Sequence, residues 1–193
     1  MKEDESARRL AAHEAGHAVM AHFLKIPFVS VSTVGDAGRG SAGHIEMKES
    51  ADVVESEWGA DGEFDTTTRI SIECHLMTLL AGMLAEVELF GSLRAEDVDG
   101  AQGDRSAAIQ IAMQCSGSVD ECQAYIDWLI IRVANKLRTP LNRVVLQAVA
   151  DRLADGCTLT FQDIDLITNE ARSAALTERR PDRRRNPRHS ETA

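Results

Sequence analysis

The segment His13-Glu14-Ala15-Gly16-His17 contains two histidines four residues apart and a glutamate directly after the first. On a helix, residues i and i+4 lie one turn apart on the same face, so two imidazole nitrogens can bind one metal ion at about 2.0–2.1 Å. Glu14 is rotated by roughly 100° from His13, which places it better to meet a metal-bound water than to bind the metal. Zinc lowers the pKa of such a water toward about 7, and a nearby carboxylate can take its proton. The pattern therefore predicts a zinc site for peptide-bond hydrolysis, with His13 and His17 as ligands and Glu14 as general base.

The segment around this motif is predicted to be helical. No proline interrupts the chain from Asp4 to Lys25, and Pro27 follows. The two histidines occupy positions of an apolar helical stripe, so they are either buried core histidines or metal ligands. Burying two imidazoles costs free energy unless each finds a partner, which one shared ion supplies. Gly16 costs about 1 kcal/mol relative to alanine inside a helix, which predicts that another backbone passes close to it.

A catalytic zinc site needs a third protein ligand and one open position. Spacing alone leaves the third ligand open among many acidic residues and histidines. These candidates are Glu46, Glu73, Glu86, Asp97, Asp99, Asp104, His44 and His75.

Several blocks of the chain resemble, in the same order, the peptidase domain of the FtsH family of membrane-anchored AAA proteases. Residues 8–19 (RRLAAHEAGHAV) are similar to its opening, where HEAGHA follows a short basic and apolar run. Residues 29–34 with 41–44 (SAGH) resemble its strand and small-Gly-Tyr segment, and residues 80–91 (LAGMLAEVELFG) resemble its LGGRAAEEIIFG block. Residues 103–112 (GDRSAAIQIA) are similar to NDIxxATxIA. The resemblance continues weakly through the closing helices to about residue 170.

The resemblance implies that Asp104 is the third zinc ligand, because the aspartate of the last block has that role in the family. The chain departs from the family at Met83, Gly103 and Ile109. An aspartate before Arg105 also suits a helix cap, and one side chain can do both. Glu86 lies in an otherwise apolar segment, so it is either a carboxylate that fixes the tautomer of a ligating histidine or a charge that reaches solvent.

A β-hairpin is predicted beside the motif helix. Residues 28–34 alternate in polarity, and a glycine-rich turn leads to a second short strand near residues 43–47. An edge strand beside the site can pair with an extended peptide through main-chain hydrogen bonds. This predicts substrate contacts at Val31, Thr33 and His44. The alternatives are a purely structural hairpin and an exposed His44.

The fold class expected from these patterns is mainly α (α+β), a helical zinc-peptidase domain with a small sheet beside the motif helix. Further helices are predicted at residues 66–90, 104–114, 119–137, 140–154 and 161–176. The length of 193 residues and 44% hydrophobic content suit one domain, expected at residues 1–170.

Residues 171–193 are expected to form a basic, unstructured tail. They contain seven Arg and three acidic residues, a net charge of +4. Because the whole chain has a net charge of −10, the remaining residues carry −14. Such a tail suits an acidic partner, nucleic acid, anionic lipid or a merely solubilising end equally well.

Four cysteines without a CxxC pair, and no signal peptide, indicate reduced thiols and a cytoplasmic location. The longest apolar run, residues 76–85, is about half the length that spans a bilayer, so no transmembrane segment is expected. The chain contains no GxxxxGK[ST] phosphate loop and hence none of the ATPase module of the family. Three possibilities remain. Proteolysis needs no ATP, it relies on a separate AAA ATPase or a homo-oligomer, or the chain is a fragment of a longer protein.

Three hypotheses follow. The first is a zinc metalloendopeptidase that cleaves unfolded or extended polypeptides. The second is a binding or regulatory module that holds the metal but has weak or no activity. The third is a helical structural protein in which the motif is accidental.

Overall fold

The computed structural model describes residues 2–34, 43–47, 66–92 and 98–178. Within these ranges the chain is mainly helical with a small antiparallel sheet, which confirms the expected fold class. In chain order the elements are α1 (Lys2–Leu24), β1 (Phe28–Ser32), β2 (His44–Met47), α3 (Thr66–Phe90), α4 (Val98–Gln114), α5 (Val119–Leu137), α6 (Pro140–Ala154), β3 (Leu159–Thr160) and α7 (Phe161–Glu178).

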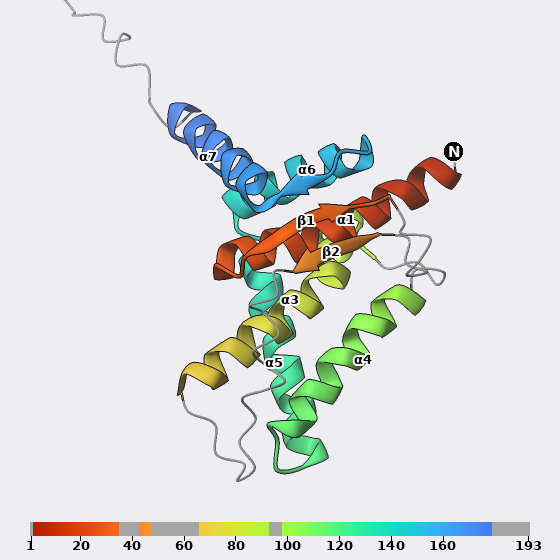
Figure 1. The fold of residues 1–193 in the computed structure, drawn as a ribbon, viewed down its shortest axis with the longest axis vertical. Coiled ribbons are helices and arrows are strands. Elements are labelled where there is room, and N and C mark those ends of the chain that lie inside the picture. Colours follow the sequence, from red (N-terminus) through yellow and green to blue (C-terminus); the bar gives the residue numbers. More distant parts are fainter. Residues whose placement is uncertain (1, 35–42, 48–65, 93–97, 179–193) are drawn as a thin grey trace, which may run out of the picture.

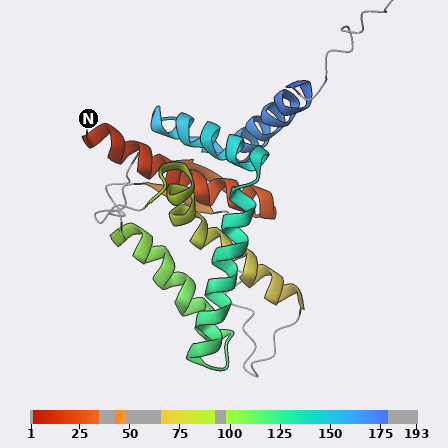
Figure 2. The ribbon, with the colours of Figure 1, turned by 180° about the vertical axis from the view of Figure 1, so that it is seen from behind.

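Helix α1 is the central element of the fold. In both ribbon views α6 and α7 lie on one side of α1, and α3, α4 and α5 lie on the other (Figures 1 and 2). Its inward positions are mostly small and fully buried, among them Ala11, Ala15 and Ala18. Small side chains allow neighbouring helices to pack closely on several faces of α1. The motif histidines are therefore carried by a helix that packs against α3, α6 and α7.

Helices α1 and α3 approach most closely at Gly16. A Cβ atom built on Gly16 would lie 2.4 Å from the carbonyl oxygen of Ala81 and 2.6 Å from the Cβ of Ala85. Both distances are shorter than van der Waals contact, so only glycine fits here without moving α3. The sequence-based expectation of a close backbone at Gly16 is thus confirmed.

The C-terminal end of α3 is tied to α1 by Arg9. Arg9 is 6% exposed, and its guanidinium donates to the carbonyl of Ser92 at 2.8 Å and lies 4.7 Å from the centre of the Phe90 ring. Gly91 ends the helix with φ +81°, as expected for a C-terminal stop. Arg9 lies one turn before His13 on α1, so this contact lies beside the site.

Helix α3 is the one described helix long and apolar enough to cross a membrane by length and composition. Half of its most apolar window is buried inside the protein. Its buried side chains include Ile72, Leu76 and Leu80, which belong to the hydrophobic core.

The sheet has the order β2-β1-β3, with β1 in the centre. Val31 of β1 pairs with Ile45 on one side and with Leu159 on the other, both antiparallel. The third strand was not expected from the sequence, in which Thr160 directly precedes the helix predicted at residues 161–176. Thr160 also caps this helix, because its hydroxyl accepts from the backbone N–H of Asp163 and the Asp163 carboxylate accepts from the backbone N–H of Thr160.

One expected helix boundary is wrong. Helix α4 begins at Val98, six residues before the expected start, so Asp104 lies inside the helix and does not cap it. Helix α7 ends at Glu178, two residues beyond the expected end, so residues 171–178 of the expected unstructured tail are helical. The predicted glycine-rich turn and most of the basic tail lie outside the described residues.

Replacing Gly16 by alanine should destabilise the protein by about 1–3 kcal/mol, because the added methyl group collides with the backbone of α3. Urea unfolding in the presence of a chelator would measure this. Gly103→Ala is the matched control, since it is also a helical glycine but its Cβ would meet nothing within 4 Å. This control should be neutral or slightly stabilising, as expected from helix propensity. Equal stability of the two variants would contradict the close packing of α1 and α3.

Candidate metal centre

Three potential metal ligands from two helices converge on one point. His13 and His17 of α1 and Asp104 of α4 offer ligand atoms that all lie within 4.8 Å of one another. The Oδ2 atom of Asp104 is 2.8 Å from Nε2 of His13 and 3.1 Å from Nε2 of His17. The structure thus brings together the two motif histidines and the aspartate that the family resemblance implied, although these residues are about 90 positions apart.

Each imidazole is oriented through its other nitrogen. Nδ1 of His13 lies 2.7 Å from Oε1 of Glu86, and Nδ1 of His17 lies 2.8 Å from the backbone carbonyl of Thr78. Both partners are on α3. A carbonyl only accepts hydrogen bonds, and so does an ionised carboxylate, so each Nδ1 carries a proton and donates it. Glu86 is 2% exposed, which decides between the two alternatives: it is a buried carboxylate that orients a histidine.

With the two rings oriented in this way, a positive charge is required between their Nε2 atoms and Asp104. In a neutral imidazole that donates from Nδ1, the Nε2 atom has a lone pair and no proton. Both Nε2 atoms face the same oxygen of Asp104, which also has only lone pairs when ionised. Such contacts at 2.8 and 3.1 Å need a proton or a cation between the atoms. The donor set of two imidazoles and one carboxylate fits zinc, which binds nitrogen and oxygen ligands in sites of this composition.

Gly82 of α3 leaves room for this arrangement. A Cβ atom built on Gly82 would lie 2.5 Å from Nε2 of His17 and 2.6 Å from Nε2 of His13. Any side chain at this position would therefore occupy the space that the two nitrogens share. The backbone of α3 at Gly82 forms the floor of the candidate metal centre.

Glu14, the expected general base, is buried beside the site, with 6% of its surface exposed. Burial raises the pKa of the Glu14 carboxyl, and this outweighs the opposing effect of the nearby imidazoles, which include His44. Gly43 packs closely against it, since a Cβ on Gly43 would lie 2.7 Å from Oε1 of Glu14. The Glu14 carboxylate thus has a raised proton affinity and lies in a confined position.

His13 and Asp104, which lie in direct contact, have opposite pKa shifts. Burial alone would lower the pKa of His13, but the hydrogen bonds with Asp104 and Glu86 outweigh it and raise this pKa to about 10. Burial alone would raise the pKa of Asp104, but the hydrogen bonds from His13 and His17 hold it well below its usual range. In the absence of a metal, a proton on His13 therefore stabilises the cluster.

Two of the three predicted substrate contacts do not lie at the site. Val31 is fully buried and paired on both sides, and the hydroxyl of Thr33 donates to the carbonyl of Leu153 at 3.0 Å. His44 is partly buried and lies on β2 near Glu14. Its Nδ1 atom is buried and has no hydrogen-bond partner among the described residues.

Other described candidates for the third ligand lie elsewhere, whereas Asp97 and the side chain of Asp99 are outside the described part of the chain. Glu73 binds Arg132 at 2.6 Å, Glu46 is exposed on β2, and His75 is partly buried with a pKa lowered by burial. Sequence reasoning missed the roles of Gly82 and of the Thr78 carbonyl. The spacing of Thr78, Gly82 and Glu86, four residues apart on one helix face, is the signal that could have found them.

No family model and no curated protein matches this chain.

Replacing Gly82 by alanine should weaken zinc binding at least about tenfold, because the methyl group occupies the space between the two Nε2 atoms. The variant keeps all three ligand residues. Competition with a chromogenic chelator would measure the affinity. Gly103→Ala, next to a ligand but without a steric conflict, should bind zinc as the wild type does. Unchanged affinity in Gly82→Ala would mean that a metal does not bind in this space.

The stability of the metal-free protein should depend on pH through His13. Its folded pKa of about 10 lies above the ordinary value of 6.5, so its contribution is fully present below about pH 6.5 and is lost as pH rises toward 10. Asp104 has the opposite shift, so its contribution is lost as pH falls below its ordinary value of 3.8. Urea unfolding with a chelator at pH 6, 8 and 9.5 should show that His13→Gln costs most stability at pH 6. An equal loss of stability in His13→Gln at all three pH values would contradict the raised pKa of His13.

Proposed function

We propose that this protein is a zinc-dependent metalloendopeptidase that hydrolyses peptide bonds in unfolded or extended polypeptides. The observation that carries the proposal is the convergence of two imidazole Nε2 atoms and one carboxylate oxygen next to a buried glutamate. The block-by-block resemblance to the FtsH peptidase domain supports the same class. The departure from that family at Gly103 does not carry Asp104 away from the histidines.

In this proposal His13, His17 and Asp104 hold the zinc ion, and Glu86 and the Thr78 carbonyl orient the two imidazoles. Zinc, when bound, supplies Lewis acidity that polarises a carbonyl and acidifies a bound water. The Glu14 carboxylate takes a proton during attack on the peptide and delivers it to the leaving nitrogen. Burial, which raises the pKa of Glu14, favours the first of these two transfers.

The substrate would be held as an added strand. In the described sheet β2 is at one edge and β1 is covered on both sides, so the outer edge of β2 is the position for an extended peptide. This replaces the earlier expectation of contacts at Val31 and Thr33. Main-chain pairing tolerates many side chains and suits unfolded substrates. Folded substrates would require a separate AAA ATPase or another means of unfolding.

The experiment that tests the proposal is Glu14→Gln in the full chain loaded with zinc. The amide is nearly isosteric but cannot accept a proton, so zinc content should stay at the wild-type level while casein cleavage falls at least about a hundredfold. Glu170→Gln, a surface change on α7, should retain full activity and serves as the matched control. Unreduced cleavage by Glu14→Gln would refute the assigned role. A zinc-loaded wild type without any turnover would instead favour a metal-holding binding module.

A further inference from the structure

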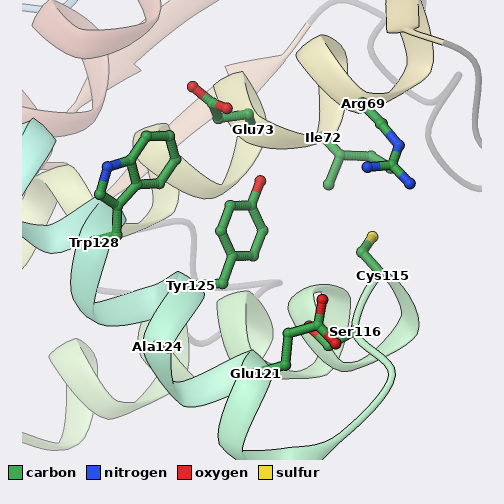
Figure 3. Close-up of a pocket in the computed structure, with 9 residues that line it drawn as sticks. All are labelled: Arg69, Ile72, Glu73, Cys115, Ser116, Glu121, Ala124, Tyr125 and Trp128. Atoms are coloured by element: carbon green, nitrogen blue, oxygen red, sulfur yellow. The ribbon is translucent and has the colours of Figure 1, made fainter.

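A second site lies away from the candidate metal centre, between α3, α5 and the end of α4. It is an open pocket of about 470 Å³, a size typical of small-molecule sites (Figure 3). Its lining residues on α3, among them Arg69 and Glu73, are nine or more positions before Gly82. At 1.5 Å per residue, this separation is at least about 13 Å along the helix. The pocket and the candidate metal centre are therefore different places on one helix.

One wall of the pocket is aromatic and held in place by neighbouring groups. The rings of Tyr125 and Trp128 on α5 are nearly parallel, with centroids 6.0 Å apart. The guanidinium of Arg132 lies 4.6 Å from the centre of the Trp128 ring and binds Glu73 at 2.6 Å. Ile72 and Ala124 add apolar surface. This wall suits a planar or apolar group.

The acceptors in the pocket already have protein partners. Glu73 is paired with Arg132, and Glu121 accepts from the backbone N–H of Gly117 at 2.7 Å. The hydroxyl of Ser116 donates to the carbonyl of Ala112 at 2.8 Å.

Two donors in the pocket have no such partner. Within the described part of the chain, no hydrogen bond or ion pair involves the Arg69 guanidinium or the Tyr125 hydroxyl. Figure 3 shows the Arg69 guanidinium pointing toward the Cys115 thiol across the pocket. Burial raises the pKa of Tyr125 to about 12, so its hydroxyl keeps its proton at neutral pH and can donate. The polar pocket side chains without a hydrogen bond or ion pair to another described residue are thus donors, one of them cationic, and they suit an anionic acceptor on the ligand.

We propose that this pocket binds a small carboxylic acid with a planar, apolar body. The carboxylate accepts hydrogen bonds from Arg69 and Tyr125, and the body lies against Ile72 and the aromatic wall. This site does not depend on the proposed peptidase activity, because none of its residues contacts the candidate metal centre.

Calorimetric titration of the full chain with 2-naphthoate tests the proposal. We expect saturable binding of one molecule per chain, and binding of the uncharged 2-naphthamide at least about tenfold weaker, because the charge-assisted contact is lost. A peptide with a blocked N-terminus and a C-terminal phenylalanine is the second probe. Should the peptide bind tenfold more tightly than 2-naphthoate, the ligand would be a polypeptide end and the small-acid assignment would be wrong.

Two variants locate the binding. Arg69→Gln should weaken the binding of 2-naphthoate at least about tenfold, and Tyr125→Phe should weaken it about threefold. Arg152→Gln removes a surface cation of α6 and should bind 2-naphthoate as the wild type does. Binding of 2-naphthoate at the candidate metal centre would not depend on Arg69. An unchanged affinity of Arg69→Gln for 2-naphthoate therefore overturns the proposal.

The cysteines offer an independent readout. Cys115 lines the pocket, whereas Cys157 is exposed in the turn between α6 and β3. Saturating 2-naphthoate should slow alkylation of Cys115 by N-ethylmaleimide several-fold and leave Cys157 unaffected. Equal alkylation of Cys115 with and without 2-naphthoate would show that the pocket is not the binding site.

Discussion

Two glycines allow the close packing of α1 against α3 on which the site depends. Gly16 accommodates the carbonyl of Ala81, and Gly82 leaves space below the imidazoles of His13 and His17. At this distance α3 supplies a hydrogen-bond acceptor to each histidine, the Glu86 carboxylate to one and the Thr78 carbonyl to the other. A wider separation of the two helices would remove both acceptors at once. The steric fit of two backbones thus decides which nitrogen of each imidazole is free to bind a cation.

The charges of the cluster are consistent with a cation in the site. Glu14, Glu86 and Asp104 bring three carboxyl groups around two imidazoles in a largely buried space. Buried carboxylates are costly unless they are paired with positive charge or accept hydrogen bonds. A proton on His13 offsets part of this cost, and a divalent ion would offset more. Zinc binding would therefore displace protons, and its apparent affinity would increase with pH.

The sequence predicted the local parts of this structure well and the long-range parts unevenly. Helix bounds at residues 66–90, 119–137 and 140–154 follow from periodicity, proline and glycine, and the structure has them unchanged. The start of α4 was missed because residues 98–103 contain two glycines and lack the apolar stripe from which a helix is predicted. The pairing of Asp104 with His13 came only from a family resemblance, since spacing left many acidic candidates open. Strand β3 has two residues and no periodicity of its own, so only its partner β1 defines it.

The position of β3 in the chain has a consequence for synthesis. All three candidate ligands lie within the first 104 residues, whereas the second edge of β1 is covered by residues 159 and 160. While the chain emerges from the ribosome, the ligands are therefore available well before the central strand is paired on both sides. During this interval β1 exposes unpaired N–H and C=O groups, which are a template for pairing with another chain. The growing polypeptide thus passes through a stage in which self-association competes with completion of its own sheet.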